Sequence, residues 1–390
     1  MRLPCVLYRL EALLGARLPS LRSAQVRGLA LWVFGTVLAQ NGCQNAVLGA
    51  LSRWGRVTTL RQYLREWLKD GSDKSRPCAS EVDVGACFPA LLEWVIACSG
   101  TRQLALGLDA TTCRDRVAAL VLSVLYRGSG IPIAWQMLPG NQKGSWKRAV
   151  IDLLERFPPG SASGVSVVVM VDRGLWSQEI YQSIRRRGWH PLMRLQEEVF
   201  FRPQGEALNR ARLMLPGPGH AWIGTGEFFR DQKRRFSGTL AAVWLEGYKE
   251  PILCVTDLKP EEVEPLWYGL RTWIELGFRF LKSFGWQWER TRRMECVRVE
   301  RHWLVLAVAT LLVAANGTKE ELAGEKRSAA PLSNPRRRCR FQSVLARGLR
   351  TLRDAFVRGH LRTTLRLVTE PLPALPANVH RIYHHAQHPT

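Results

Sequence analysis

The sequence lacks any apolar stretch long enough to cross a bilayer. The longest run of apolar residues among its 390 is the thirteen-residue WLVLAVATLLVAA, which starts at Trp303. A membrane-spanning helix needs about twenty such residues, so a buried helix is the expected structure here. The N-terminal apolar segment is interrupted by Arg9, Glu11 and Arg17, which a secretory signal would not tolerate. We therefore expect a cytoplasmic chain with no membrane partner.

Closely spaced cysteines are also absent. The nine cysteines are odd in number, scattered along the chain, and form no C-x-x-C pair. This pattern argues against a zinc site or a disulfide framework and favours buried, reduced thiols. The C-terminal tail carries His380, His384, His385 and His388, which could bind a metal adventitiously. A polar, disordered end is the interpretation that we favour for it.

Acidic residues are scarce relative to basic ones. The chain has 33 Asp and Glu against 56 Lys and Arg, which gives a formal net charge of +23 at pH 7. Such a surplus attracts polyanions, of which nucleic acid is the commonest. An anionic membrane surface is the rival interpretation, but it would require a basic amphipathic helix or a polybasic segment beside a hydrophobic span.

The basic surplus is concentrated near the C-terminus. Between residues 336 and 366 ten arginines accompany a single acidic residue, Asp354. This composition favours binding to a DNA backbone, with a strong dependence on salt. The same stretch has an apolar stripe that leaves packing or dimerisation open, and its members are Leu345, Leu349, Leu352, Phe356 and Leu361.

The order of predicted elements indicates a mixed α/β protein. Residues 4–70 have helical periodicity, and residues 104–138 read as three strands joined by tight connections. A helix over 145–157 and a continuously apolar strand over 165–172 follow. Three antiparallel strands, a helix and a buried strand are the opening of a ribonuclease H-like fold, in which the fourth strand lies parallel beside the first. That topology would place Asp109 and Asp172, at the C-terminal ends of these strands, side by side.

Changes in pattern along the chain suggest five regions. We expect a ribonuclease H-like catalytic core with a β-rich insertion, between an all-helical N-terminal region and a basic helical C-terminal region. The N-terminal helices are candidates for DNA binding, although plain packing explains them equally well. The expected limits are 1–99 for the N-terminal region, 100–200 and 259–318 for the two parts of the core, 201–258 for the insertion, and 319–390 for the C-terminal region and tail.

A helix that starts at Pro265 carries a third carboxylate among cations. At 100° per residue, Tyr268, Arg271, Glu275 and Lys282 share one narrow stripe, and Gly285 is a natural stop. A solvated face with an Arg–Glu pair is the simpler interpretation. We favour a functional one, because the stripe is mostly cationic and follows two strand-end aspartates. Packed on the sheet edge, this helix would bring Glu275 to the two aspartates.

Three clustered carboxylates repel one another unless cations balance them. Mg²⁺ suits hard oxygen ligands and also coordinates phosphate, and two such ions stabilise the attacking and leaving oxygens of an in-line displacement. The chemistry implied is phosphoryl transfer at a nucleic-acid backbone. Arg271, Arg279 and Lys282 would then hold neighbouring phosphates. Tyr268 would either bond a phosphate or pack in the core.

The segment YGLRTWIELGFRFLK matches the pattern Y-x(2)-R-x(3)-E-x(6)-K and follows LGLDATT and VDRGLWS. From Leu104 to Lys282 the chain resembles the bacterial insertion-sequence DDE transposases of the branch with this signature. The resemblance implies Asp109, Asp172 and Glu275 as catalytic, metal-binding residues, and Tyr268, Arg271 and Lys282 as phosphate contacts. It implies Mg²⁺, with Mn²⁺ able to substitute, double-stranded DNA as element ends and target, a homodimer in the synaptic complex, and a bacterial, nucleoid-associated location.

Such enzymes cut at inverted-repeat ends and join the freed 3′-OH ends to target DNA, and some relatives pass through a DNA hairpin. A tryptophan of the insertion can then support a flipped base, and Trp222 and Trp244 are the candidates here. Two other functions stay open. One is a non-catalytic DNA-binding derivative of a transposase, and the other is a metal-dependent nuclease that hydrolyses DNA without joining it.

Overall fold

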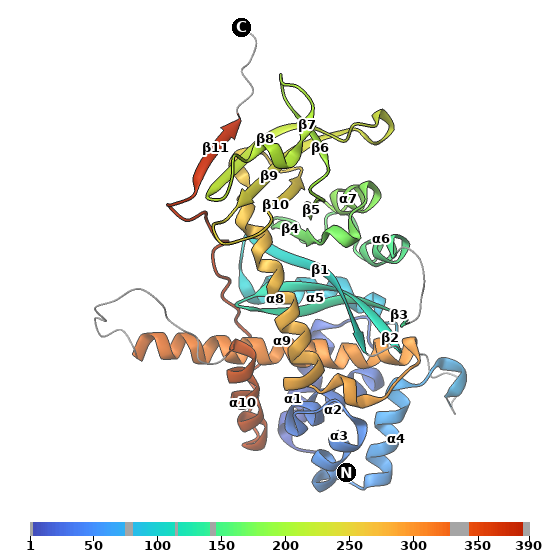
Figure 1. The fold of residues 1–390 in the computed structure, drawn as a ribbon. Helices are drawn as coiled ribbons and strands as arrows, with labels where there is room; N and C mark the ends of the chain where they lie inside the picture. Colours follow the sequence, from blue (N-terminus) through green and yellow to red (C-terminus); the bar gives the residue numbers. More distant parts are fainter. Residues whose placement is uncertain (1–2, 75–80, 114–115, 141–145, 328–342, 385–390) are drawn as a thin grey trace. The chain divides into compact units, whose positions relative to one another are not determined.

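The computed structural model describes residues 3–74, 81–113, 116–140, 146–327 and 343–384. It is a mixed α/β structure in which helices accompany a large mixed sheet (Figure 1). The chain divides into two compact units. The first comprises Met1–Thr101, Ala110–Gly144 and Trp273–Thr369, and the second comprises Arg102–Asp109, Ser145–Thr272 and Glu370–Thr390. Strand β1 (Gln103–Cys113) contributes residues to both.

The N-terminal part of the first unit is helical, as its periodicity predicts. Helix α4 shows the reason, because its apolar positions Leu60, Leu64 and Leu68 recur every four residues and are all buried. By contrast α2 is apolar over most of its surface and is buried along almost its whole length. The helices are α1 (Cys5–Arg17), α2 (Ser23–Ala39), α3 (Gln44–Leu51), α4 (Val57–Leu68) and α5 (Phe88–Ser99).

Helices from the C-terminal half of the chain also belong to this unit. The apolar run from Trp303 lies in α9 (Cys296–Arg327) and is buried, as predicted. Helix α10 (Val344–Val357) approaches α9 so closely that a Cβ on Gly317 would collide with the backbone carbonyl of Val344. In the parts of the chain that are described, no helix has the length and apolarity that a membrane crossing requires.

The predicted apolar stripe of the C-terminal stretch is buried in full, so it packs within the chain. Its arginines from Arg347 onward are described, and those from Arg350 onward are exposed. Arg336, Arg337, Arg338 and Arg340 lie outside the described residues.

The first unit also contains an antiparallel hairpin. Strands β2 (Val117–Tyr126) and β3 (Ser129–Pro139) pair along their length, and Gly128 adopts the positive φ of 81° that the tight turn demands. Helix α9 packs against β3, where the indole of Trp135 donates to the Glu300 carbonyl over 3.1 Å. The strand order here is β3-β2-β1, which agrees with the predicted meander.

The second unit is built on parallel strands. Strand β4 (Ser166–Val171) lies parallel to β1, and β5 (His190–Arg194) lies parallel to β4. All of β4 except its first residue is buried, which accounts for its continuous apolar run. Helices α6 (Lys147–Glu155) and α7 (Gln178–Arg185) are the connecting elements. The predicted parallel neighbour of the first strand is therefore confirmed.

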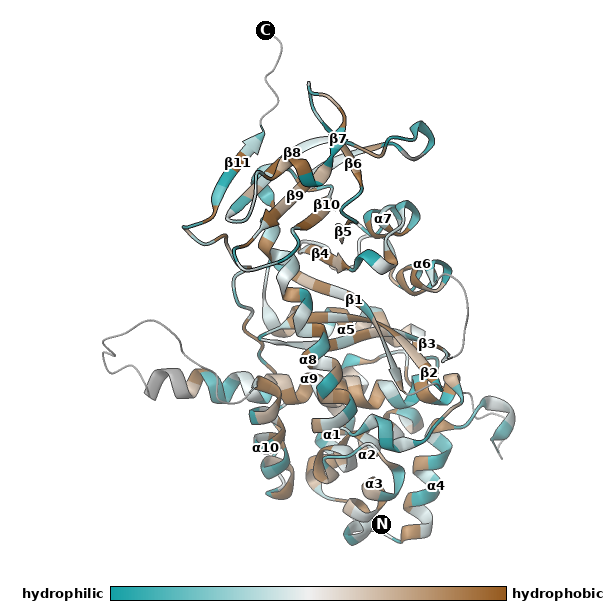
Figure 2. Ribbon diagram, in the orientation of Figure 1, coloured by the Kyte–Doolittle hydropathy of each residue, from teal (hydrophilic) through white to brown (hydrophobic). Residues whose placement is uncertain are grey.

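Antiparallel strands extend this sheet beyond β5, in the order β5-β10-β9-β8-β6-β7. Figure 2 shows hydrophobic residues following one another along β9 and β10. The bounds are β6 (Phe200–Pro203), β7 (Asn209–Arg210), β8 (His220–Phe228), β9 (Phe236–Trp244) and β10 (Ile252–Thr256).

The prediction of a disordered tail is wrong for the part that is described. Strand β11 (His380–His384) pairs in parallel with β8, which places Ile382 opposite Trp222. Arg381 forms an ion pair of 2.9 Å with Glu264, and Nε2 of His384 lies 2.9 Å from a carboxylate oxygen of Glu206. An edge strand offers free backbone groups with which another strand can pair. His385 and His388 lie outside the described residues.

Candidate active site

Asp109 and Asp172 come together because their strands are parallel and in register. Leu108 of β1 lies opposite Val171 of β4, and each aspartate is the next residue along its chain. The side chain of Asp109 is 18% exposed and that of Asp172 is 33% exposed. Both carboxylates therefore lie at the same edge of the sheet and reach solvent.

Two donors from the segment after β10 hold these carboxylates. Nη2 of Arg271 lies 2.8 Å from Oδ2 of Asp109 and 3.7 Å from Oδ2 of Asp172, so one guanidinium bridges both acids. The hydroxyl of Tyr268 donates to Oδ1 of Asp172 over 2.9 Å. Burial, reinforced by the nearby Cys254 and Asp172, raises the pKa of Tyr268 far above its usual range. The phenol therefore stays protonated and remains a donor.

The helix that carries the third predicted acid is less regular than expected. Pro265–Arg271 form a 3₁₀-helix, Thr272–Arg279 form α8, and Phe280–Phe284 form a π-helical turn that ends at Gly285. The predicted stop at Gly285 is confirmed. The single stripe at 100° per residue is wrong, because a 3₁₀-helix turns more and a π-helix turns less per residue than an α-helix.

The structure divides the predicted site residues between the units. Asp109, Asp172, Tyr268 and Arg271 belong to the second unit, where the distances above join them. The first unit contains Glu275 and Arg279, which are exposed on α8, and Lys282, whose ammonium lies 3.7 Å from Glu289. Glu275 follows Arg271 by four residues.

Comparison with known families settles which family this site belongs to. The family model of the transposase DDE domain matches residues 109–312, which is more than half of the chain, and this span includes both aspartates and Glu275. The chain belongs to the transposase DDE domain family. It is a DDE transposase, as the resemblance of its motifs implies.

We also compared the chain with curated proteins and with solved structures. No curated protein matches this transposase. Among solved structures it is similar to a cryo-EM structure of the piggyBac transposase synaptic complex with hairpin DNA, at 11% identity and a TM-score of 0.31, over 92% of this chain and 83% of that one.

The acid pair of this transposase has the chemistry of a divalent-metal site. Among the described residues, no group of three or more His, Cys, Asp or Glu is arranged to hold a metal ion. The two carboxylates nevertheless provide hard oxygen ligands at a solvent-reached edge, and a cationic group already balances their charge. The two carboxylates therefore fit a divalent metal ion as part of a ligand set that further groups would complete.

Two arginines near the acid pair, Arg194 and Arg173, were not among the predicted site residues. The guanidinium carbon of Arg194 lies 6.0 Å from the ring centroid of Tyr268. Arg194 and Arg173 both approach Glu250, at 3.8 and 3.5 Å. The position of Arg194 in the sequence could have identified it. It ends a strand that lies parallel to β4, and the C-terminal ends of parallel strands meet at one sheet edge.

The two candidate tryptophans differ in their surroundings. Trp222 on β8 is 5% exposed, packs edge-on against Phe201, and stacks on His384 at 5.8 Å between ring centroids. Trp244, at the end of β9, is half-buried, and its indole donates to the Tyr248 carbonyl over 2.9 Å. The guanidinium of Arg212 lies 5.2 Å from its ring. The half-exposed Trp244 is the better placed of the two to meet a ligand.

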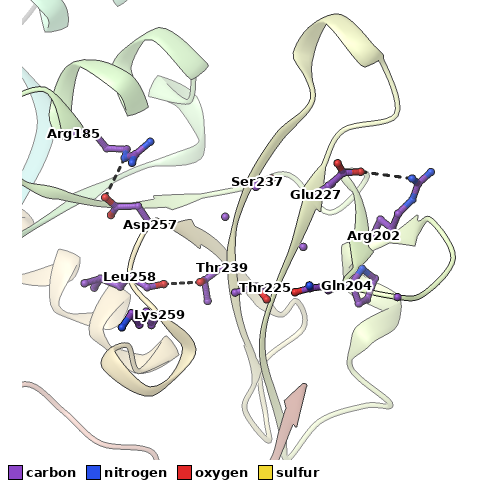
Figure 3. Close-up of a pocket in the computed structure, with 14 residues that line it drawn as sticks. Arg185, Arg202, Gln204, Thr225, Glu227, Ser237, Thr239, Asp257, Leu258 and Lys259 are labelled. Atoms are coloured by element: carbon purple, nitrogen blue, oxygen red, sulfur yellow. Dashed lines mark hydrogen bonds and ion pairs between the residues drawn. The ribbon is translucent and has the colours of Figure 1, made fainter. Parts of the chain in front are cut away.

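A cavity of about 580 Å³ lies over the antiparallel strands of the same unit (Figure 3). Its lining has three cationic side chains, Arg185, Arg202 and Lys259, and two acidic ones. Arg185 pairs with Asp257 at 3.1 Å, and Arg202 lies 3.6 Å from Glu227. The two carboxylates therefore offset most of the positive charge of this cavity.

Proposed function

We propose that this transposase mobilises an insertion sequence, and that it belongs to the branch with the Y-x(2)-R-x(3)-E-x(6)-K signature and a ribonuclease H-like core. It would cut DNA at the inverted-repeat ends and join the freed 3′-OH ends to target DNA. The observation that carries the proposal is the pairing of Asp109 with Asp172 at one sheet edge, bridged by Arg271 of the signature segment.

Glu275 is proposed as the third carboxylate. It lies one helical turn along the chain from Arg271, and it occupies the acidic position of the signature. Two Mg²⁺ ions bound by these three acids, with Mn²⁺ able to replace them, would polarise the scissile phosphate and activate the attacking oxygen. Such ions would take over the charge balance that Arg271 now provides, and would release its guanidinium for a phosphate.

The chain's other polar groups orient DNA. Arg271, Arg279 and Lys282 are proposed phosphate contacts, since guanidinium and ammonium groups bind phosphate oxygens directly. Tyr268 fixes the orientation of Asp172 through its hydroxyl. Trp244, and less favourably Trp222, would support a flipped base if the reaction passes through a hairpin.

The organisation of the molecule follows from this activity. We propose DNA binding by the N-terminal helices 1–99 and by the basic region 319–390, on either side of a core that the β-rich insertion interrupts. The partner is double-stranded DNA, both element ends and target, and the synaptic complex contains a homodimer. A bacterial cytoplasm with its nucleoid is the expected location.

An assay of joining separates this proposal from the two alternatives. A labelled duplex that carries the flanks of the gene is incubated with the protein, Mg²⁺ and an unlabelled target plasmid. Transposition gives cleavage together with labelled plasmid, whereas a nuclease gives cleavage alone. Binding without cleavage would indicate the non-catalytic derivative.

A further inference from the structure

A second cavity, of about 500 Å³, lies within the first unit and is lined by arginines. Arg61 and Arg65 come from α4, and Arg290, Arg292 and Arg293 come from the segment that precedes α9. The start of α3 completes the wall. No Asp or Glu and no aromatic ring is among the described residues that line it, so the cavity is strongly and uniformly cationic.

These charges have no internal balance. Within the described residues, Arg61, Arg65, Arg290 and Arg292 form no ion pair, and Arg61 and Arg65 stand four residues apart, where like charges repel along a helix. The guanidinium groups of the 580 Å³ cavity behave differently, because each has a carboxylate near it. A cluster of cations around one hollow, with no carboxylate beside it, attracts an anion.

The innermost arginine is held in place without a carboxylate. Arg293 donates to Gln44 over 3.3 Å, and its guanidinium lies 5.7 Å from the ring of Trp32. Its buried Nε has no hydrogen-bond partner among the described residues. Burial lowers the pKa of Arg293 to about 10, so the group is still charged at neutral pH. Such a buried donor without a partner is costly unless a ligand satisfies it.

The backbone around the cavity is arranged to present donors. Helix α3 begins at Gln44 with no side-chain cap, and the amide of its N-cap residue, Cys43, is already taken by Asn41. The free amides of the first turn and the helix dipole favour an anion there. Arg292 adopts a φ of 56°, a left-handed conformation that is rare for residues with a Cβ. Strain of this kind is typical of functional positions.

We propose that this cavity is a phosphate site that holds adjacent backbone phosphates of DNA, and that it acts in binding rather than in cleavage. Five guanidinium groups exceed the charge of one phosphate, which favours successive phosphates of a strand. The absence of an aromatic lining residue argues against a nucleotide bound by its base. The choice of DNA as the source of the phosphates rests on the proposed function.

The test compares Arg61→Gln/Arg65→Gln with a control pair, Arg156→Gln/Arg186→Gln, at the C-terminal ends of α6 and α7 and outside the regions proposed to bind DNA. All four arginines are exposed, so both variants should fold, which circular dichroism verifies. Affinity for a fluorescein-labelled duplex is measured by anisotropy across a range of KCl concentrations. We expect the cavity variant to bind more weakly and to lose about two units of salt slope, at about one unit for each phosphate contact. The control pair should keep the wild-type slope, and Arg61→Lys/Arg65→Lys should restore most of it.

Free phosphate is the second arm of the experiment. Pyrophosphate should raise the melting temperature of the wild type and of the control, and should raise that of the cavity variant less. If the cavity variant loses the pyrophosphate effect but binds DNA like the control, the ligand is a free polyphosphate and the proposal fails. Equal salt slopes and equal pyrophosphate effects in both variants would overturn the site altogether. A wild type that does not bind duplex DNA would instead overturn the proposed function.

Discussion

At the residue scale, the acid pair depends on donors that stand close to it in space but far from it in sequence. Arg271 follows Asp109 by 162 residues and Asp172 by 99 residues, yet its Nη2 reaches both carboxylates. The strand register alone brings the acids together. Their orientation is the work of Arg271 and Tyr268, which makes these two side chains testable separately from the acids.

Tyr268→Phe removes one donor and nothing else. Asp172 loses its 2.9 Å hydrogen bond, and because this carboxylate is one-third exposed, we expect a loss of about 1 kcal/mol in the free energy of unfolding. DNA cleavage should fall more than stability does, because Asp172 would no longer be held in one orientation. Urea denaturation and a cleavage time course measure the two effects. Unchanged cleavage would mean that the hydroxyl has no positioning role.

His302 predicts a specific pH dependence of stability. It is fully buried beside Trp32, with ring centroids 5.3 Å apart, and burial holds its pKa well below the usual value. Below about pH 6.5 the unfolded chain binds a proton at this residue that the folded chain does not. The contribution of His302 to stability should therefore be constant above that pH and should fall by up to about 1.4 kcal/mol per pH unit below it.

The variant His302→Leu isolates this contribution. It should unfold with a shallower loss of stability between neutral and mildly acidic pH than the wild type, whatever its absolute stability. Urea unfolding at several pH values gives the two slopes. Identical slopes would show that His302 accepts a proton in the folded state.

At the element scale, the helix that carries Glu275 is fixed by close packing. A Cβ on Gly277 of α8 would lie 2.7 Å from the backbone nitrogen of Gly130 on β3, so the helix touches the strand directly. Both residues belong to the first unit. The contact requires glycine at this position, although nothing in the sequence marks it as more than a residue of an amphipathic helix.

Gly277→Ala should therefore displace α8. The added methyl group cannot fit without movement, and overpacking of this kind costs about 1–3 kcal/mol. We expect lower thermal stability and weaker cleavage, with DNA binding retained. Gly49→Ala, in the open interior of α3, is the control and should be neutral or stabilising. Wild-type cleavage by Gly277→Ala would show that the position of α8 is not critical.

Much of the fold could be predicted at this scale, because the strongest patterns are also the most buried elements. Strand β4 is one example, and its parallel place beside β1 followed from the order of elements. The 3₁₀ and π turns around α8 could not be predicted, since helical periodicity assumes a constant rotation. Strand β11 was also missed, because its polar side chains give no alternation and its pairing is made by backbone groups.

The sequence likewise predicted part of the candidate site. The acids were found because carboxylates at strand ends are distinctive, and Arg271 because of its signature. The bond from Tyr268 to Asp172 and the place of Arg194 depend on side-chain conformations that no sequence pattern specifies.

At the scale of the whole molecule, the net charge of +23 and the acid pair fulfil complementary requirements. A transposase must hold a polyanion over a long surface and still concentrate negative charge where metal ions bind. The exposed arginines from Arg350 to Arg366 and the arginine-lined cavity would serve the first requirement. Asp109, Asp172 and Glu275 would serve the second.

Metal-dependent cleavage by the three carboxylates is the central claim, and one assay tests it directly. A labelled duplex with both flanks of the gene is incubated in Mg²⁺ or in EDTA with the wild type, Asp109→Asn, Glu275→Gln and the surface control Asp152→Asn. We expect cleaved and joined products for the wild type and the control in Mg²⁺ alone. Cleavage by Asp109→Asn and by Glu275→Gln should fall about 1000-fold or more, which corresponds to several kcal/mol of transition-state stabilisation, while DNA binding survives. Undiminished cleavage by Glu275→Gln, or cleavage in EDTA, would contradict the central claim.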